Sequence, residues 1–104
     1  MAIDLEKKYL KEIQSIIQQY APDCRVRVFG SRVTGKSGKF SDLDLAIEGS
    51  KELGLQTMVK MKDAFRESNL PFKVDVLDWL AISGEFRKQI NQECITIQGN
   101  SKND

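Results

Sequence analysis

The sequence predicts a mixed α/β (α+β) fold in which a small mixed sheet has helices packed on one face. Two observations lead to this class. Apolar residues recur at helical spacing over residues 4–20 and 51–68, whereas shorter segments such as 42–48 alternate apolar and polar residues, as half-buried strands do. With 104 residues and a 40% hydrophobic composition, the chain suits one compact domain, so we expect a single domain over 1–104.

The first half of the chain is expected to hold a helix and two strands. The helix covers residues 4–20 and ends before a proline. Residues 24–29 alternate and are rich in branched side chains, which predicts a strand that ends at Gly30. Residues 31–41 are rich in glycine and serine and predict a loop with one helical turn, and residues 42–48 form the second strand.

The second half is expected to continue with a helix, a strand, a short helix and a short last strand. These elements cover residues 51–68, 72–77, 83–93 and 95–97, and a serine at the start of the short helix can cap it. Residues 99–104 are polar, and we expect them to be a disordered tail. Two long helices on one face of the sheet leave the other face, or one end of it, free for a site.

The residue types present restrict the chemistry. The chain has no histidine, and its two cysteines, Cys24 and Cys94, do not form a CxxC motif. Zinc sites built from cysteine and histidine and nucleophiles activated by histidine are therefore excluded, and the cysteines are expected to be small buried hydrophobes. The groups that could still carry the chemistry of a site are carboxylates, lysines, hydroxyls and metals bound through oxygen.

The charge balance restricts the partners and the location. Sixteen basic and fifteen acidic residues leave a formal net charge of +1, which does not favour direct, stable binding to nucleic acid. No apolar run is long enough to span a membrane, and the N-terminus lacks the features of a secretory signal. We therefore expect a cytoplasmic protein.

Three aspartates are the candidate metal ligands and catalytic residues. Asp42 and Asp44 lie two apart on a predicted strand, so their side chains share one face, where their mutual repulsion favours a bound cation. Asp75 lies in another, otherwise apolar strand, and three carboxylates can hold two Mg²⁺ ions. Taken alone, a D-x-D pair is more often a solvated strand face.

A glycine-serine turn precedes these carboxylates. Gly30 permits a sharp turn and close approach of the backbone to a ligand, and the Ser31 hydroxyl can donate to a phosphate oxygen. Arg32, Lys36 and Lys39 can neutralise phosphate charge, and Arg32 can do so with two parallel hydrogen bonds. The combination of this turn with the three carboxylates predicts nucleotide transfer from a triphosphate to an acceptor.

At these residues the chain resembles a known family. Gly30-Ser31, ten further residues and then Asp42-Leu43-Asp44 match the G-S-x10-D-x-D signature of the nucleotidyltransferase superfamily that includes DNA polymerase beta. The longer segment over residues 29–45 resembles the minimal nucleotidyltransferases (MNT) of bacteria and archaea. Residues 74–78 resemble the strand that carries the third carboxylate in that family. The resemblance covers nearly the whole chain.

The resemblance implies a nucleotidyltransferase fold, ATP as substrate and two Mg²⁺ ions. It also implies a partner, a HEPN-domain RNase toxin in a hetero-oligomer, to whose tyrosine the MNT protein transfers AMP and so acts as antitoxin. The residues that would do this work are Asp42, Asp44 and Asp75 as metal ligands, Asp75 also as base, and Gly30 and Ser31, with Arg32 and Lys39, as the triphosphate site.

Several alternatives stay open from the sequence. The protein could mask the toxin without catalysis, or could transfer AMP to the hydroxyl of a small molecule. Asp78 also lies near the third strand, but it should face away from Asp75 and could instead cap the turn before Trp79. A partner-binding patch could be formed by Phe72, Trp79 and Leu80, although core packing is the favoured interpretation. A contact to the base or ribose could come from one of five cations, and the sequence does not distinguish among Lys60, Lys62, Arg66, Arg87 and Lys88.

Overall fold

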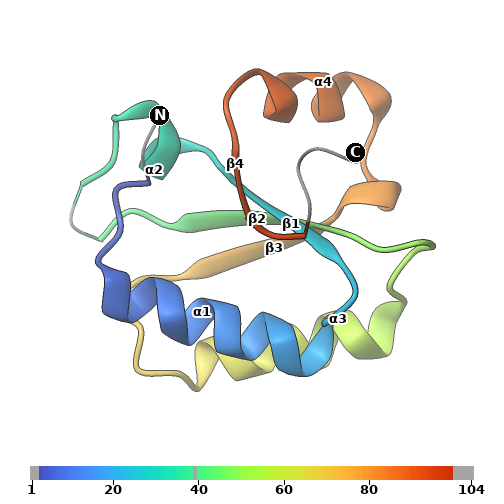
Figure 1. The fold of residues 1–104 in the computed structure, drawn as a ribbon, viewed down its shortest axis with the longest axis horizontal. Helices are drawn as coiled ribbons and strands as arrows, with labels where there is room; N and C mark the ends of the chain where they lie inside the picture. Colours follow the sequence, from blue (N-terminus) through green and yellow to red (C-terminus); the bar gives the residue numbers. More distant parts are fainter. Residues whose placement is uncertain (1–2, 39, 100–104) are drawn as a thin grey trace.

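The computed structural model describes residues 3–38 and 40–99 of the chain. The predicted helices and strands are confirmed, with ends that differ by a few residues, and a short 3-10 turn (η1) is an addition that the sequence did not predict (Figure 1). In chain order the elements are α1 (Lys7–Tyr20), β1 (Arg25–Phe29), α2 (Ser31–Thr34), β2 (Leu43–Glu48), α3 (Leu55–Arg66), β3 (Val74–Asp78), η1 (Trp79–Ala81), α4 (Gly84–Gln92) and β4 (Ile95–Gln98).

The four strands form one mixed sheet in the order β3-β2-β1-β4. Strand β1 is antiparallel to β2 on one side and to β4 on the other, whereas β2 is parallel to β3. A parallel pair needs a crossover between its strands, and α3 supplies it. Strand β3 therefore lies at an edge of the sheet, next to the strand that carries Asp44.

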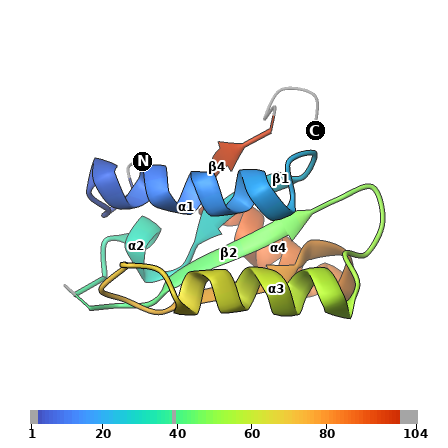
Figure 2. The same cartoon turned by 90° about the horizontal axis from the view of Figure 1, so that it is seen from below.

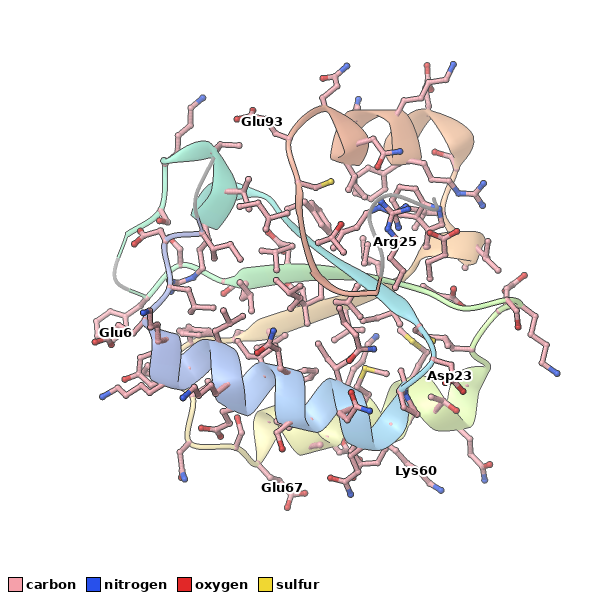
Figure 3. The ribbon with its side chains drawn as sticks, viewed as in Figure 1. Glu6, Asp23, Arg25, Lys60, Glu67 and Glu93 are labelled. Carbon is pink, nitrogen blue, oxygen red and sulfur yellow. The ribbon has the colours of Figure 1, made fainter. Side chains whose placement is uncertain are left out.

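Helices α1 and α3 lie side by side on one face of the sheet (Figures 1 and 2). Charged side chains such as Lys60 and Glu67 point away from the sheet on the outer side of this layer (Figure 3). The alternation of β2 places its apolar residues between the sheet and the helices, so this face holds the main core. Its fully buried large side chains are Ile13, Ile17, Val26, Val28, Leu43, Leu45, Ile47 and Met61.

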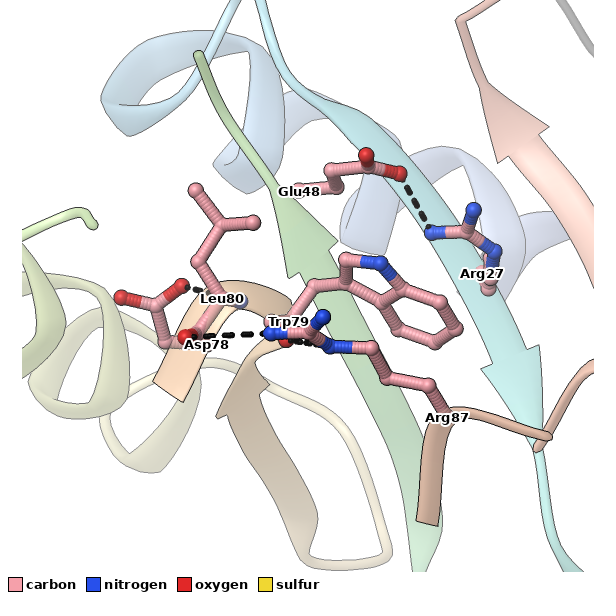
Figure 4. A network of polar contacts seen from close by, with 6 residues as sticks. All are labelled: Arg27, Glu48, Asp78, Trp79, Leu80 and Arg87. Atoms are coloured by element: carbon pink, nitrogen blue, oxygen red, sulfur yellow. Dashed lines mark hydrogen bonds and ion pairs between the residues drawn. The ribbon is translucent and has the colours of Figure 1, made fainter. Parts of the chain in front are cut away.

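The two long helices pack on one face as expected, and the opposite face, expected to be free at least at one end, is covered in part by α4 and η1 (Figure 1). A second, smaller core there contains Trp79, which confirms the favoured interpretation of this residue as core. The guanidinium of Arg27 stacks 3.7 Å from the centre of the Trp79 ring and lies 2.9 Å from the Glu48 carboxylate (Figure 4). This buried cluster closes one end of the face and leaves the Asp44 end open.

No helix among residues 3–38 and 40–99 has the length and apolar character needed to cross a membrane. The tail predicted for 99–104 lies, beyond Gly99, outside the described residues.

Candidate active site

Asp44 and Asp75 lie directly beside each other on neighbouring parallel strands. The register of β2 and β3 pairs Asp44 with Asp75, and the register of β1 and β2 pairs Asp44 with Phe29 on its other side. Residues paired in this way project to the same face of the sheet. Both carboxylates are half-buried. The structure therefore brings together two of the three aspartates that the sequence predicted as a cluster.

Asp42 lies one residue before β2 and is exposed. It is nevertheless close enough to influence Asp44, whose pKa is raised above its ordinary value of 3.8 by burial first, then by the charge of Asp75 and then by that of Asp42. The ionised form of Asp44 is thus disfavoured by burial and by two like charges, and the sequence predicted this repulsion between neighbouring carboxylates.

Gly30 closes the site on the side of β1. Its φ of 84° is one that residues with a side chain rarely adopt, and a Cβ at this position would overlap the Asp44 carboxylate. The glycine was predicted for close approach to a ligand, and in the structure its close neighbour is this carboxylate. Ser31 begins α2 directly after Gly30 and is half-buried, so the turn and the Asp44–Asp75 pair are adjacent.

Arg32 has partners other than a phosphate site. Its side chain is buried, and its guanidinium donates from Nε to the Ser41 carbonyl at 3.0 Å and from Nη1 to the Asp4 carbonyl at 2.7 Å. These contacts count against the triphosphate contact predicted for Arg32, because two of its donors already bind backbone carbonyls within the protein. Lys36 is exposed on the loop after α2, and Lys39 lies outside the described residues.

Asp78 is not part of the carboxylate pair. It is buried, and its side chain accepts hydrogen bonds from the backbone N–H of Leu80 at 3.1 Å and of Leu53 at 2.8 Å. It caps η1, as expected from the sequence for a residue that faces away from Asp75.

A cleft of about 720 Å³ runs along β3 and includes Asp44 and Asp75 in its lining. Its volume falls in the usual range of small-molecule sites. Sequence reasoning did not assign Phe29 and Phe86 to the site, although they form an edge-to-face pair with ring centres 6.0 Å apart in the wall of the cleft. The cations in the lining are Lys62, Arg66 and Lys73.

Lys73 is a further residue that the sequence reasoning missed. Its Nζ lies 3.6 Å from the Asp75 carboxylate, two residues along the chain. The signal was present in the sequence, because residues two apart in an extended segment project to the same side. Lys62 and Arg66 had been considered for the base or ribose, and both line the cleft.

The donor set suits a hard cation. Carboxylate oxygens are the ligands that Mg²⁺ prefers, and a cation between the strands would offset both the burial and the like charges that raise the pKa of Asp44. Among residues 3–38 and 40–99, no three acidic, cysteine or histidine side chains are already gathered at metal-binding distance. The three aspartates therefore have the right chemistry and neighbouring positions, without being assembled as a closed ligand set.

The mixed sheet, the glycine-serine turn and the carboxylates beside it define the class of protein as a nucleotidyltransferase. A comparison with protein families agrees: the model described as "Polymerase beta, Nucleotidyltransferase" matches residues 11–103. The chain belongs to this family.

The chain is also similar to one relative by sequence and to two solved structures by fold. The chain is 43% identical, over 100 residues that cover 96% of it and 88% of the relative, to the "Probable protein adenylyltransferase MntA" of Haemophilus influenzae. The fold matches a chain of a crystal structure of a toxin-antitoxin with AMP-PNP, with a TM-score of 0.77, 20% identity, and coverage of 90% of this chain and 76% of the other. It also matches a structure of tri-AMPylated Shewanella oneidensis HEPN toxin in complex with MNT antitoxin, with a TM-score of 0.73, 18% identity, and coverage of 96% and 77%.

Proposed function

We propose that this protein transfers AMP from ATP to a hydroxyl, expected to be that of a tyrosine, of a cognate HEPN-domain RNase toxin, and thereby acts as its antitoxin. The observation that carries the proposal is the Asp44–Asp75 pair, which lies in register on parallel strands with Gly30 closed against Asp44. The relative from H. influenzae, which bears the name of a protein adenylyltransferase, supports the same activity.

Asp42, Asp44 and Asp75 are the residues that would hold Mg²⁺, expected as two ions. When bound there, the metal would offset the negative charge of the triphosphate and of the attacking oxygen. Lys73 now balances Asp75, and this lysine is exposed and long enough to move aside. Bringing the third carboxylate into a ligand set therefore requires no change in the backbone register of β2 and β3.

The reaction assigns a distinct part to each side of Asp44. The acceptor oxygen forms a bond to the α-phosphorus of ATP, the bond from that phosphorus to the bridging oxygen breaks, and pyrophosphate leaves. On the β1 side, Gly30 and Ser31 would hold the triphosphate. On the β3 side, Asp75 would accept the proton of the acceptor hydroxyl. Attack and departure on opposite sides of phosphorus agree with this order of residues across the sheet.

The test combines the purified protein with ATP, Mg²⁺ and the cognate toxin and measures the intact mass of the toxin. We expect the mass to rise by one or more AMP units. The double variant Asp42→Asn/Asp44→Asn should lower the rate at least about a hundredfold, because both changes remove charge from the reacting centre. The matched control is Asp23→Asn/Asp63→Asn, which changes two carboxylates outside the cleft lining and should transfer at the wild-type rate.

Three outcomes would contradict the proposal. An unmodified toxin with the wild-type protein would exclude the activity. Full transfer by the Asp42→Asn/Asp44→Asn variant would exclude the assigned residues. Neutralisation of the toxin by that variant at equal abundance, without AMP transfer, would instead support masking of the toxin by binding.

The predicted cytoplasmic location stays a prediction from the sequence.

A further inference from the structure

The Arg32 side chain lies at the meeting point of four segments. It belongs to α2, one residue after Ser31, and only 5% of it is exposed. Its guanidinium stacks 4.3 Å from the centre of the Phe72 ring, which belongs to the segment that leads into β3. Its Nε donates to the carbonyl of Ser41, the residue directly before Asp42. One planar group therefore contacts both the residue before Asp42 and the segment that leads into the strand of Asp75.

The same guanidinium also holds the segment before α1. Nη1 of Arg32 donates to the Asp4 carbonyl at 2.7 Å, and the Asp4 N–H donates to the Arg32 carbonyl at 2.7 Å. The Asp4 carboxylate in turn accepts a hydrogen bond from Ser37 Oγ, on the loop between α2 and β2. This loop is joined to Ser41 as well, because the Gly38 N–H donates to Ser41 Oγ at 2.7 Å.

We propose that Arg32 is a positioning residue that sets the distance between the phosphate turn at Ser31 and the metal ligand Asp42. The proposal rests on the function proposed above, and it assigns to Arg32 no contact with ATP. Ser31 and Asp42 both lie beyond the last pair of the β1–β2 ladder, Phe29 with Asp44, and the described residues of the loop between Gly35 and Ser41 form no helix or strand. The contacts of Arg32 constrain the spacing of Ser31 and Asp42 across the base of the loop.

A guanidinium suits this work for a geometric reason. It is planar and carries donors that point in fixed, different directions, so it can bond two carbonyls and stack on a ring at once. A lysine at this position keeps the charge but lacks the planar face and the fixed fork. A glutamine keeps one amide donor group but is shorter and uncharged. Arg32→Lys should therefore retain part of the positioning of Asp42 relative to Ser31, and Arg32→Gln should retain less of it.

The experiment measures how strongly Mg²⁺ enhances the binding of AMP-PNP, with calorimetry in the presence and absence of the metal. The position of Asp42 relative to Ser31 is expected to couple the binding of Mg²⁺ to the binding of AMP-PNP. Arg32→Gln should therefore lower the enhancement of AMP-PNP binding by Mg²⁺ about tenfold. Arg32→Lys should lie between this variant and the wild type. With the toxin as acceptor, Arg32→Gln should reduce kcat more than it changes the KM for ATP.

The matched control is Arg87→Gln. Arg87 also uses its guanidinium to bond two backbone carbonyls, those of Trp79 at 2.9 Å and Leu80 at 3.2 Å, but these bonds join α4 to η1 (Figure 4). It should lose comparable stability and keep the wild-type Mg²⁺ enhancement. Amide hydrogen exchange should become faster over residues 35–42 in Arg32→Gln and near η1 in Arg87→Gln.

Equal Mg²⁺ enhancement in Arg32→Gln and the wild type would overturn the proposal, as would an equal loss in Arg87→Gln. If Arg32→Gln does not fold, the Mg²⁺ enhancement is measured in Arg32→Lys and Ser37→Ala instead. Ser37→Ala is the milder change, because it removes the hydrogen bond between the loop and Asp4 and leaves Arg32 in place. Wild-type enhancement in both would overturn the proposal, and a reduced value in both would support it. The enhancement is measured without an acceptor, so a wild-type protein that fails to modify the toxin would contradict the proposed function and leave this test intact.

Discussion

At the residue scale, Gly30 and Asp44 depend on each other. The backbone of Gly30 has a φ of 84°, and the space where its side chain would begin is filled by the Asp44 carboxylate. Two separate requirements therefore exclude other residues at position 30. The first is the conformation of the turn, and the second is the closeness of a charged group.

We expect Gly30→Ala to lower the rate of AMP transfer at least about a hundredfold, because the new methyl group displaces a carboxylate that the reaction needs. The backbone strain alone should cost on the order of 1–3 kcal/mol of unfolding free energy. Gly54→Ala separates the two effects, since Gly54 has the same φ of 84° and no atom within 4 Å of an added Cβ. An equal loss of rate in both variants at matched stability would contradict the overlap with Asp44.

Asp44→Asn should stabilise the protein at neutral pH while it abolishes transfer. The pKa of Asp44 is raised by burial, Asp75 and Asp42, so the folded state binds the proton more tightly than the unfolded state does. Asp44 therefore does not lower the free energy of unfolding of the wild type below its ordinary pKa of 3.8. The destabilisation develops as the pH rises from there through the raised pKa. We expect a gain of ~0.2–1 kcal/mol at pH 7, the range of partly exposed charge pairs.

Urea unfolding of Asp44→Asn and the wild type at pH 3 and pH 7 measures this difference. Asp63→Asn is the control, because Asp63 is on α3 and pairs with Arg66 at 3.0 Å, so its loss should not stabilise. A gain that is as large at pH 3 as at pH 7 would rule out the charge of Asp44 as its cause.

The residue identities of the site followed from chemistry that is local in the sequence. The D-x-D spacing places two carboxylates on one face of any strand, whatever surrounds it, and the glycine-serine turn follows from backbone sterics. For Arg32 the residue type predicts a phosphate contact and a buried contact with carbonyls equally well, so the sequence alone does not distinguish the two. In the structure the Arg32 guanidinium binds the carbonyl of Asp4, a residue far away in the sequence, and no local pattern predicts this contact.

At the scale of elements, periodicity predicted the helices and strands correctly in type and order. Strand β2 shows why, since its alternation separates Leu43, Leu45 and Ile47 from Asp44 without reference to any partner. The turn η1 was missed because three residues are too few to show a period. The expected start of α4 was correct: the Ser83 side chain accepts a hydrogen bond from the Phe86 N–H at 3.1 Å.

We expect Ser83→Ala to lower the free energy of unfolding by about 1 kcal/mol, because it leaves the N–H groups of the first turn of α4 without this acceptor. Ser15→Ala is the matched control. Ser15 is exposed in the middle of α1, where alanine is the better helix former, so this change should be neutral or stabilising. Urea unfolding curves give both values. A loss in Ser83→Ala no greater than in the control would contradict the capping role.

At the scale of the whole molecule, the near-neutral charge balance does not favour binding to nucleic acid. With a net charge of +1, the protein should bind a single-stranded 30-mer of DNA or RNA no more tightly than about 10⁻⁴ M at physiological salt. Fluorescence anisotropy with a labelled strand measures this. Submicromolar affinity with a steep dependence on salt would show a basic surface that the overall charge conceals.

The sequence by itself determined the class of fold, the identity of the carboxylates and the turn beside them, because each depends on periods and spacings of a few residues. Only the tertiary structure decided that α4 covers the second face, that Asp75 lies in register with Asp44, and that the Arg32 guanidinium binds the carbonyls of Ser41 and Asp4. Those facts depend on which strands pair and which segments meet. Such contacts join residues far apart in the chain, and their free energy depends on packing that no local pattern encodes.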